Sequence, residues 1–284
     1  MAKRKEKSQI YHTQRIKEYP IAGVWECLTA SRPIFREPGW ENIRDKNLPL
    51  YGKSDAADVG REVRSNPSAE SVARSVRRAR VALRDYALST EFRYFVTLTL
   101  DADKIDRYDM AEITRRMQTW CSNQVQRCGL AYVLVPERHK DGAVHFHGFF
   151  NDALPAVDSG TIVPPTGGKP RRPRSNAERS KWLSEGGRIV YNLPGWTLGF
   201  TTAMELYGEY PKAVAYVCKY IGKQQGGELP QKIGGRWYYS GGNLGRPVIH
   251  YGDGTARECS ENDGAYVFEI PAAHAVFVKE TGNY

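Results

Sequence analysis

The stretch AVHFHGFF at residues 143–150 is the part of this chain on which its expected fold depends most. In a β-strand successive side chains point to opposite faces, so His145 and His147 share one face while Val144 and Phe146 share the other. One face would carry two imidazoles and the opposite face would join a hydrophobic core. Neighbouring imidazoles can bind one divalent metal ion, but an isolated H-x-H pair is also typical of a half-exposed strand. The rest of the chain must therefore decide between a metal site and a surface pair.

The residues just upstream provide a possible third ligand. AYVLVPE (131–137) predicts a strand, and HKDG (139–142) predicts a turn that leads into the histidine strand as a hairpin. Glu137 ends the first strand and is expected to lie near His145. A His-His-Glu set with open positions suits Mg²⁺ or Mn²⁺ together with a phosphate oxygen. His139 is an alternative third ligand, although an exposed turn residue is the more ordinary role for it.

Earlier in the chain, EFRYFVTLTLD (91–101) predicts a buried strand on which Thr97 and Thr99 share one face. Helical spacing then indicates a helix over about 109–128, with Gly129 as its C-terminal stop. The order from residue 91 to residue 150 is therefore β-α-β-β.

A long helix is expected before this unit, with Asn66 as its N-cap and Pro67 in its first turn. An apolar stripe along it is formed by Val72, Val76, Ala79, Leu83 and Ala87. Its other faces are rich in arginine. This arginine-rich surface is either a solvated face or a face that contacts DNA, and the residues concerned are Arg74, Arg77, Arg78, Arg80 and Arg84.

Residues 211–223, PKAVAYVCKYIGK, predict a second important helix. Tyr216 and Tyr220 lie four residues apart and share a face, with Lys219 and Lys223 as an adjoining pair. A phenol has a pKa near 10, and nearby lysines favour the phenolate. A tyrosine that attacks a phosphodiester forms a covalent phosphotyrosine, which conserves the bond energy for rejoining. Either tyrosine alone is readily explained by packing at a core edge, whereas the combined pattern Y-x-x-K-Y-x-x-K is not.

Segments outside these motifs define the expected domain organisation. Residues 1–64 are expected to be a basic arm, and residues 65–284 the main domain, with a short β-rich C-terminal extension at 231–284. A short strand is expected on each side of Pro194. The span 151–187 is rich in Pro, Gly and Ser and is expected to be an inserted loop. It carries a basic cluster, Lys169, Arg171, Arg172 and Arg174.

Charge and composition limit the class of protein. The net charge of +9 and pI near 9.2 make nucleic acid the first partner to consider. No apolar run is long enough to span a membrane, and the N-terminus lacks the apolar stretch of a secretory signal. The five cysteines form no C-x-x-C pair, so reduced thiols in a cytoplasm are expected. No G-x-x-x-x-G-K-[ST] phosphate loop is present, so unwinding of DNA would need a separate helicase.

The ordered motifs FVTLTL, HFHGF and YVCKYIGK resemble the three motifs of the HUH endonucleases (His–hydrophobe–His) over about residues 70–225. The resemblance is greatest to the two-tyrosine branch, which includes the microvirus A protein and the filamentous-phage and plasmid initiators. It implies an α+β fold, in which a central five-stranded antiparallel sheet of β-α-β-β-α-β order is flanked by helices. The helix that carries the tyrosines would pack beneath the metal.

The resemblance also implies a function. It is that of a replication initiator, a metal-dependent single-strand endonuclease and strand transferase that starts rolling-circle replication of a phage, plasmid or similar element. Thr97 and Thr99 would support the site structurally, while residues 1–60 and 151–187 match no part of the family. Single-tyrosine relatives also exist, so one tyrosine would be dispensable in that case. The implied metal ligands are His145, His147 and Glu137, the implied nucleophiles are Tyr216 and Tyr220, and the motif lysines are Lys219 and Lys223.

The expected partners are single-stranded or hairpin origin DNA and a separate helicase, polymerase and single-strand-binding protein, with no membrane. The DNA would be held by Arg74, Arg77 and Arg78, by the basic cluster at 169–174 and by the N-terminal arm. A transposase or mobilisation relaxase is the alternative within the same chemistry. A basic DNA-binding protein without catalysis is the alternative from another class. A cupin-type metal site is disfavoured, because the glutamate expected a few residues after H-x-H is absent.

Overall fold

The computed structural model describes residues 11–36, 68–139, 141–206, 210–223, 229–254, 266–270 and 275–283. The chain divides into two compact units, one formed by Met1–Pro67 with Val248–Tyr284 and the other by Ser68–Pro247. The boundary expected from the sequence, at residues 64 and 65, did not separate the C-terminal segment from the main domain. Each unit is described by itself below.

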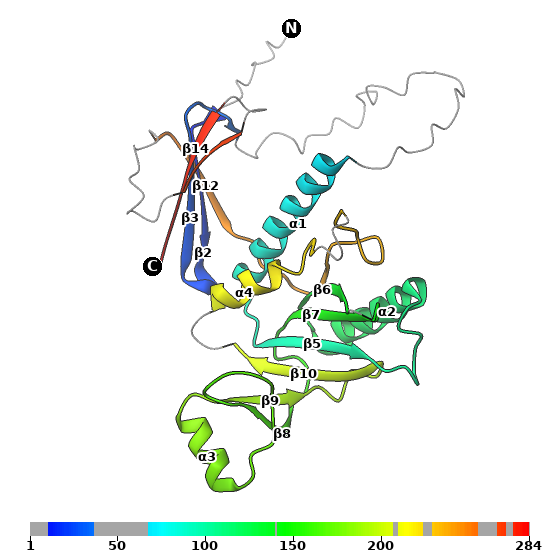
Figure 1. Cartoon of the computed structure of the whole chain (residues 1–284). Coiled ribbons are helices and arrows are strands. Elements are labelled where there is room, and N and C mark those ends of the chain that lie inside the picture. Colours follow the sequence, from blue (N-terminus) through cyan, green and yellow to red (C-terminus); the bar gives the residue numbers. More distant parts are fainter. Residues whose placement is uncertain are drawn as a thin grey trace, which may run out of the picture. The chain divides into compact units, whose positions relative to one another are not determined.

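The larger unit contains an antiparallel sheet with the strand order β11-β6-β7-β5-β10-β9-β8 (Figure 1). This confirms the α+β class, but the described residues form seven strands rather than five. The strands are β5 Tyr94–Leu100, β6 Tyr132–Arg138, β7 Val144–Phe150, β8 Val157–Val163, β9 Arg188–Asn192, β10 Gly199–Glu205 and β11 Tyr239–Gly241. The helices are α1 Ala69–Ser89, α2 Met110–Cys128, α3 Asn176–Ser184 and α4 Tyr210–Cys218.

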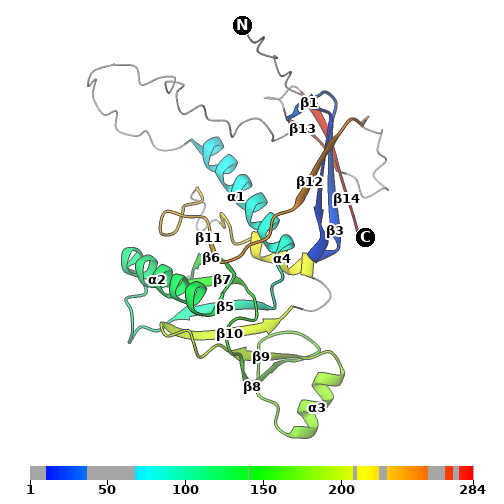
Figure 2. The same ribbon diagram turned by 180° about the vertical axis from the view of Figure 1, so that it is seen from behind.

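The alternation of side chains in β5 and β7 divides this sheet into two different faces. Val96, Leu98 and Phe146 lie on one face, where they are almost completely buried in the core. Helix α2 covers this face with an apolar stripe that includes Ile113 and Met117, and the helix lies behind the sheet in Figure 1 and before it in Figure 2. It begins at its N-cap Asp109 and ends at Gly129 in the left-handed conformation. The expected β-α-β-β order is therefore confirmed, and the histidines lie on the other face.

Helix α1 has the expected buried stripe, and all five of its predicted core residues are buried. Its N-cap is Ser68, whose hydroxyl accepts from the Ser71 amide, while the expected cap at Asn66 and Pro67 lies outside the described residues. Arg80 of α1 donates two hydrogen bonds to the carbonyl oxygen of Ile221, at 3.1 and 2.8 Å. This arginine, which the sequence offered as a DNA contact, therefore joins α1 to the segment that follows α4.

The prediction of one helix over 211–223 was wrong at its C-terminal end. The α-helix ends at Cys218, and hydrogen bonds between residues three apart continue as tight turns to Lys223. Gly222 has a φ of +72° there, and a Cβ at this position would lie 2.9 Å from the Val76 side chain. Because α4 leaves the helical path so close to α1, the later tyrosine is placed by these turns and not by regular helical geometry.

Replacing Arg80 with alanine is expected to lower the free energy of unfolding by about 2 kcal/mol, because two charge-assisted hydrogen bonds are lost. Chemical denaturation of the whole chain would measure the change. Arg77→Ala is the matched control, since Arg77 is exposed on the same helix and should change the stability little. Equal losses for the two variants would contradict a structural role for Arg80.

The segment 151–187 was expected to be a loop but contains β8 and α3. Strand β8 pairs with β9, with an irregularity between Asp158 and Thr161. Helix α3 begins with Ser175, whose hydroxyl accepts from the Glu178 amide, while Glu178 accepts from the Arg174 amide. This is close to a capping box, whose S-x-x-E signature is present in the sequence and was overlooked.

The smaller unit contains a five-stranded antiparallel sheet with the order β12-β2-β3-β14-β13 (Figure 2). Residues 14–30, expected to belong to an arm without regular structure, instead form a hairpin that pairs with C-terminal strands. The rest of the expected arm, residues 1–10 and 37–64, lies outside the described residues. The elements are β1 Tyr11–His12, β2 Gln14–Tyr19, the short helix η1 Pro20–Ala22, β3 Val24–Ala30, β4 Phe35–Arg36, β12 Val248–Gly252, β13 Tyr266–Ile270 and β14 Ala275–Asn283.

Across the part of the chain that the structure describes, no helix combines the length and the apolar character needed to cross a bilayer.

Candidate functional site

The two histidines of β7 are held by threonines of the neighbouring strand β5. His147 lies opposite Thr97 in the register and His145 opposite Thr99. In each pair the threonine Oγ1 lies 3.1 Å from the histidine Nδ1. A hydrogen bond at Nδ1 fixes the ring and leaves Nε2 available to another ligand, as in many metal-binding histidines. The structural support expected from these threonines is therefore a direct contact.

The surroundings of both imidazoles favour their neutral form. Burial lowers the pKa of His145 from 6.5 to about 4, and the neighbouring His139 and His147 lower it further by repulsion between positive charges. Burial likewise lowers the pKa of His147, although Glu137 opposes that shift. His139 stacks on His145 with ring centroids 4.0 Å apart. At neutral pH both histidines of β7 therefore have the protonation state that a metal ligand requires.

Glu137 lies opposite His145 at the end of β6, as the predicted hairpin requires. Its Oε2 is 2.9 Å from His147 Nε2, and its Oε1 accepts a hydrogen bond from Lys223 Nζ at 2.5 Å. His147 Nε2 is buried and forms no hydrogen bond, since the short approach of Oε2 lacks the direction that a bond needs. Among the described residues, no three His, Cys, Asp or Glu side chains converge as a metal site. The hairpin thus brings the predicted ligands to one place, where Lys223 engages the carboxylate.

Both tyrosines lie over this histidine face. The ring of Tyr220 stacks on His147 at a centroid distance of 4.4 Å and an angle of 13°. Tyr216 meets Tyr220 edge-on, and the Tyr220 hydroxyl donates to the Tyr216 hydroxyl at 2.5 Å. Tyr216 also packs edge-on against Phe95 and is 49% exposed, so its hydroxyl is accessible to solvent. The structure therefore brings the two predicted nucleophiles together beside His147.

The lysines do not act on the phenols as the sequence suggested. The pKa of Tyr220 is raised well above 10, first by burial and then by its hydrogen bond to Tyr216. Lys223 Nζ lies 5.5 Å from the centre of the Tyr220 ring, but its ion pair is with Glu137. Lys219 is exposed, and its amino group forms no ion pair with any described residue. Tyr220 is accordingly a neutral phenol at pH 7 in this arrangement.

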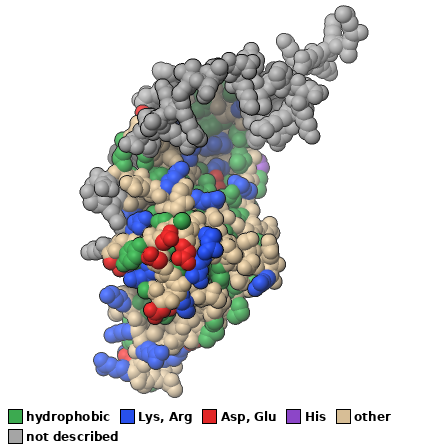
Figure 3. Space-filling model, turned by 90° about the vertical axis from the view of Figure 1, so that its right-hand side faces the viewer, with side chains coloured by type: hydrophobic (Ala, Val, Ile, Leu, Met, Phe, Trp, Pro, Cys, Tyr) green, Lys and Arg blue, Asp and Glu red, His purple; other side chains and the backbone are tan. Residues whose placement is uncertain are grey.

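The residues proposed to hold DNA lie on the surface but do not join the site through any contact within the described residues. Arg74 forms an exposed ion pair with Glu70 at 2.7 Å, and Arg171 lies over the Trp182 ring at 4.6 Å. On the face seen in Figure 3, basic side chains are scattered and acidic ones lie among them, so no continuous basic strip runs over it. The remaining proposed contacts are all exposed, namely Arg77, Arg78, Lys169, Arg172 and Arg174.

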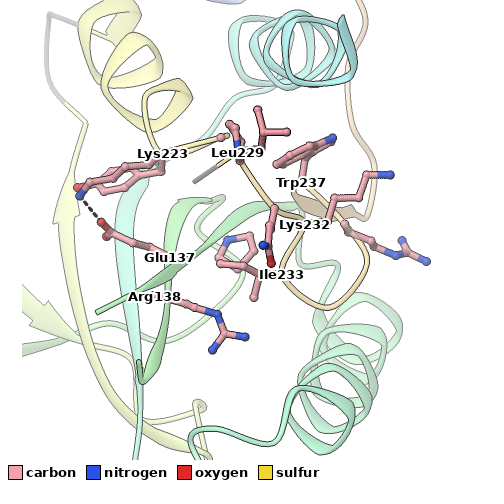
Figure 4. A pocket seen from close by; sticks show the side chains of 13 residues that line it. Glu137, Arg138, Lys223, Leu229, Lys232, Ile233 and Trp237 are labelled. Carbon is pink, nitrogen blue, oxygen red and sulfur yellow. Dashed lines mark hydrogen bonds and ion pairs between the residues drawn. The ribbon is translucent and has the colours of Figure 1, made fainter. Parts of the chain in front are cut away.

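A pocket beside the site was not foreseen from the sequence. It has a cavity volume of about 150 Å³, and Glu137, Tyr220 and Lys223 form part of its wall (Figure 4). Its other walls come from the end of β6 and from residues 229–237. The adjacent pair Arg236-Trp237 was the available signal, but the sequence analysis assigned those residues to a strand. The remaining lining residues are Pro136, Arg138, Gly222, Leu229, Pro230, Gln231, Lys232, Ile233, Arg236 and Trp237.

Paired histidines on a central strand, with a carboxylate and two tyrosines beside them, define a candidate site for phosphodiester chemistry. Residues 93–225 match the family model of the ORF2-type replication-associated proteins, which covers slightly less than half of the chain. This span begins just before β5 and ends just after Lys223, so it includes every proposed ligand and nucleophile. The match supports a role in the initiation of replication. No curated protein and no solved structure showed a significant match.

Proposed function

We propose that this protein is a replication initiator that nicks one strand of an origin and remains attached to the DNA through a tyrosine. The observation that carries the proposal is the pair of tyrosine hydroxyls 2.5 Å apart, with one ring stacked on His147, inside the region similar to replication-associated proteins. The element copied by the rolling-circle mechanism would be a phage, a plasmid or a similar replicon. Its substrate would be single-stranded or hairpin origin DNA.

In the proposed reaction a tyrosine oxygen attacks the scissile phosphorus. A phosphorus–tyrosine oxygen bond forms, and the bond from phosphorus to the 3′ oxygen breaks. The phenol loses its proton as it attacks, and the leaving 3′ oxygen gains one, so charge and atoms balance. The products are a 5′-phosphotyrosine and a free 3′ hydroxyl that a separate polymerase extends. A helicase and a single-strand-binding protein would act on the displaced strand.

The second tyrosine would allow a second cleavage while the first DNA end remains bound. The two hydroxyls share one hydrogen bond, so they lie close enough to approach the same region of substrate in turn. After one round of copying, the free tyrosine would cut the regenerated origin. The new 3′ hydroxyl would then attack the first phosphotyrosine and close the released strand.

His145, His147 and Glu137 would hold a divalent cation, Mg²⁺ or Mn²⁺. Both imidazoles are held through Nδ1, and the buried Nε2 of His147 forms no hydrogen bond, which suits an additional ligand. A bound cation would supply positive charge next to the phosphate oxygens. Lys223, once separated from Glu137, would place its own charge beside the phosphate that Tyr220 reaches.

Nicking of single-stranded DNA is the direct test. Oligonucleotides that tile the replicon encoding this chain would be incubated with the protein and Mn²⁺, with and without EDTA. We expect cleavage at one site, abolished by EDTA and slowed at least about 100-fold by His147→Ala, as when a group that stabilises the transition state is removed. Thr97→Ala should weaken metal binding by about 10–100-fold, because only the support of His147 is lost. If no oligonucleotide is cleaved with any divalent metal, the proposal fails.

A DNA-binding protein without catalysis is the second candidate, and one observation favours it. Lys223 occupies the carboxylate of Glu137, an ion pair that stabilises the site without any metal. This alternative expects DNA binding that is unchanged by EDTA and by His145→Ala, with no cleavage. The tiling experiment therefore separates the two candidates.

A further inference from the structure

The pocket next to Tyr220 combines two kinds of surface that a nucleotide requires. Trp237, Leu229 and Ile233 provide aromatic and apolar groups, and Lys232 lies beside them in the same wall (Figure 4). Pro136 and Pro230 add two more apolar groups. A flat base binds to such aromatic and apolar groups, whereas the phosphates on either side of it bind to cations.

The charge of the pocket is strongly one-sided. Four basic residues line it against a single acidic residue, Glu137, which already pairs with Lys223. Lys232 and Arg236 are exposed and form no ion pair with any described residue. The guanidinium of Arg236 lies 5.9 Å from the centre of the Tyr239 ring, which restricts it without neutralising it. An anionic ligand is therefore favoured over a neutral or a cationic one.

Trp237 is held in place before any ligand binds. Its Nε1 donates a hydrogen bond to Ser75 Oγ of α1 at 2.9 Å, and the side chain is half-buried. A ring that is already fixed loses little conformational entropy when a base stacks on it. The cavity of about 150 Å³ is smaller than the roughly 300–1,000 Å³ of pockets that enclose drug-sized molecules, so it fits a single base.

We propose that this pocket binds one base of single-stranded DNA, that of the nucleotide next to the phosphate attacked by the tyrosines. Trp237 stacks on the base, and Lys232 and Arg236 bind the adjoining backbone. The location follows from the pocket wall, since Tyr220, Glu137 and Lys223 belong to it. The position of the nucleotide relative to the cut rests on the proposed nicking function, whereas binding of the base does not.

The test compares two fluorescent probes in EDTA, so that no chemistry takes place. One is a twelve-residue oligothymidine, and the other has the same backbone without bases. Trp237→Leu is expected to bind oligothymidine at least about five-fold more weakly and the abasic probe as wild type does, because base stacking alone is lost. Trp237→Phe keeps an aromatic face and should retain most of the affinity. Arg127→Ala, an exposed cation of α2 outside the pocket, should change neither.

A second variant keeps the proposal testable if Trp237→Leu fails to fold by circular dichroism. Lys232→Ala/Arg236→Ala is expected to weaken binding of both probes and to reduce the slope of log affinity against log salt by about 1.4, as two lost phosphate contacts require. Wild-type affinity for both probes in either folded variant would overturn the proposal, and so would an equal loss on both probes in Trp237→Leu. If the base preference depends on Trp237 but no oligonucleotide is nicked, the pocket stands and the nicking function falls.

Discussion

Replacing both Tyr216 and Tyr220 with phenylalanine is expected to abolish covalent attachment of the protein to DNA. The two hydroxyls are the only groups removed, and both rings remain to pack on Phe95 and His147. Without a phenol oxygen no phosphotyrosine forms, so the loss should be complete rather than partial. The measurement is a protein–DNA adduct that survives denaturing electrophoresis after incubation with nicked-strand oligonucleotide and Mn²⁺.

Single variants show whether the hydroxyls substitute for one another. Tyr216→Phe and Tyr220→Phe each leave one hydroxyl beside His147, and we expect each to form an adduct at a reduced rate. Tyr108→Phe is the matched control, because Tyr108 is 52% exposed and is not part of the site. Adduct formation by the double variant at the wild-type level would exclude both tyrosines as nucleophiles. It would leave the metal ligands untouched, since DNA binding and nicking are measured separately.

The centre of the fold was predictable because it depends on local alternation. The period of two in HFHGF and in FVTLTL places imidazoles and threonines on one face, and the structure pairs Thr97 with His147 and Thr99 with His145. The turn that ends the hairpin is short, so Glu137 had to return near His145. These relations involve neighbouring residues or adjacent strands, where spacing alone determines which side chains meet.

Relations that depend on distant segments were not predictable in the same way. Strands 14–19 and 248–252 pair across more than two hundred residues, and no local pattern selects that partner. The end of α4 at Cys218 depends on its contact with α1, where Gly222 passes Val76. The same holds for Trp237, whose place in the site wall is set by a hydrogen bond to α1.

The ion pair between Lys223 and Glu137 changes how the motif lysine is understood. Its sequence position suggested that it lowers the pKa of a tyrosine, but its amino group is 2.5 Å from a carboxylate proposed to bind metal. A cation at that carboxylate would compete with the lysine, because both need the same oxygens. Before metal binds, Lys223 therefore limits the cost of placing Glu137, which is only 13% exposed, beside the buried histidines.

Gly148→Ala is expected to destabilise the larger unit by about 3 kcal/mol, at the upper end of the range for overpacked cores. A Cβ at this position would lie 1.8 Å from the carbonyl oxygen of Val133 and 2.9 Å from the Cα of Leu134. Both atoms belong to the backbone of β6, so no side-chain rotation relieves the contact. The glycine that follows the second histidine is therefore required by the close approach of β6 to β7.

The strain in Gly148→Ala can be relieved only by separating these two strands, which carry Glu137 and His145 in register. Loss of stability and loss of nicking should consequently occur together, even though position 148 faces away from the site. Gly195→Ala is the matched control, because its Cβ would meet only the Leu154 side chain at 3.8 Å. Chemical denaturation of both variants measures the difference. Equal unfolding free energies would mean that β6 moves away from β7 at little cost, and Glu137 would then not be held against the histidines by the sheet.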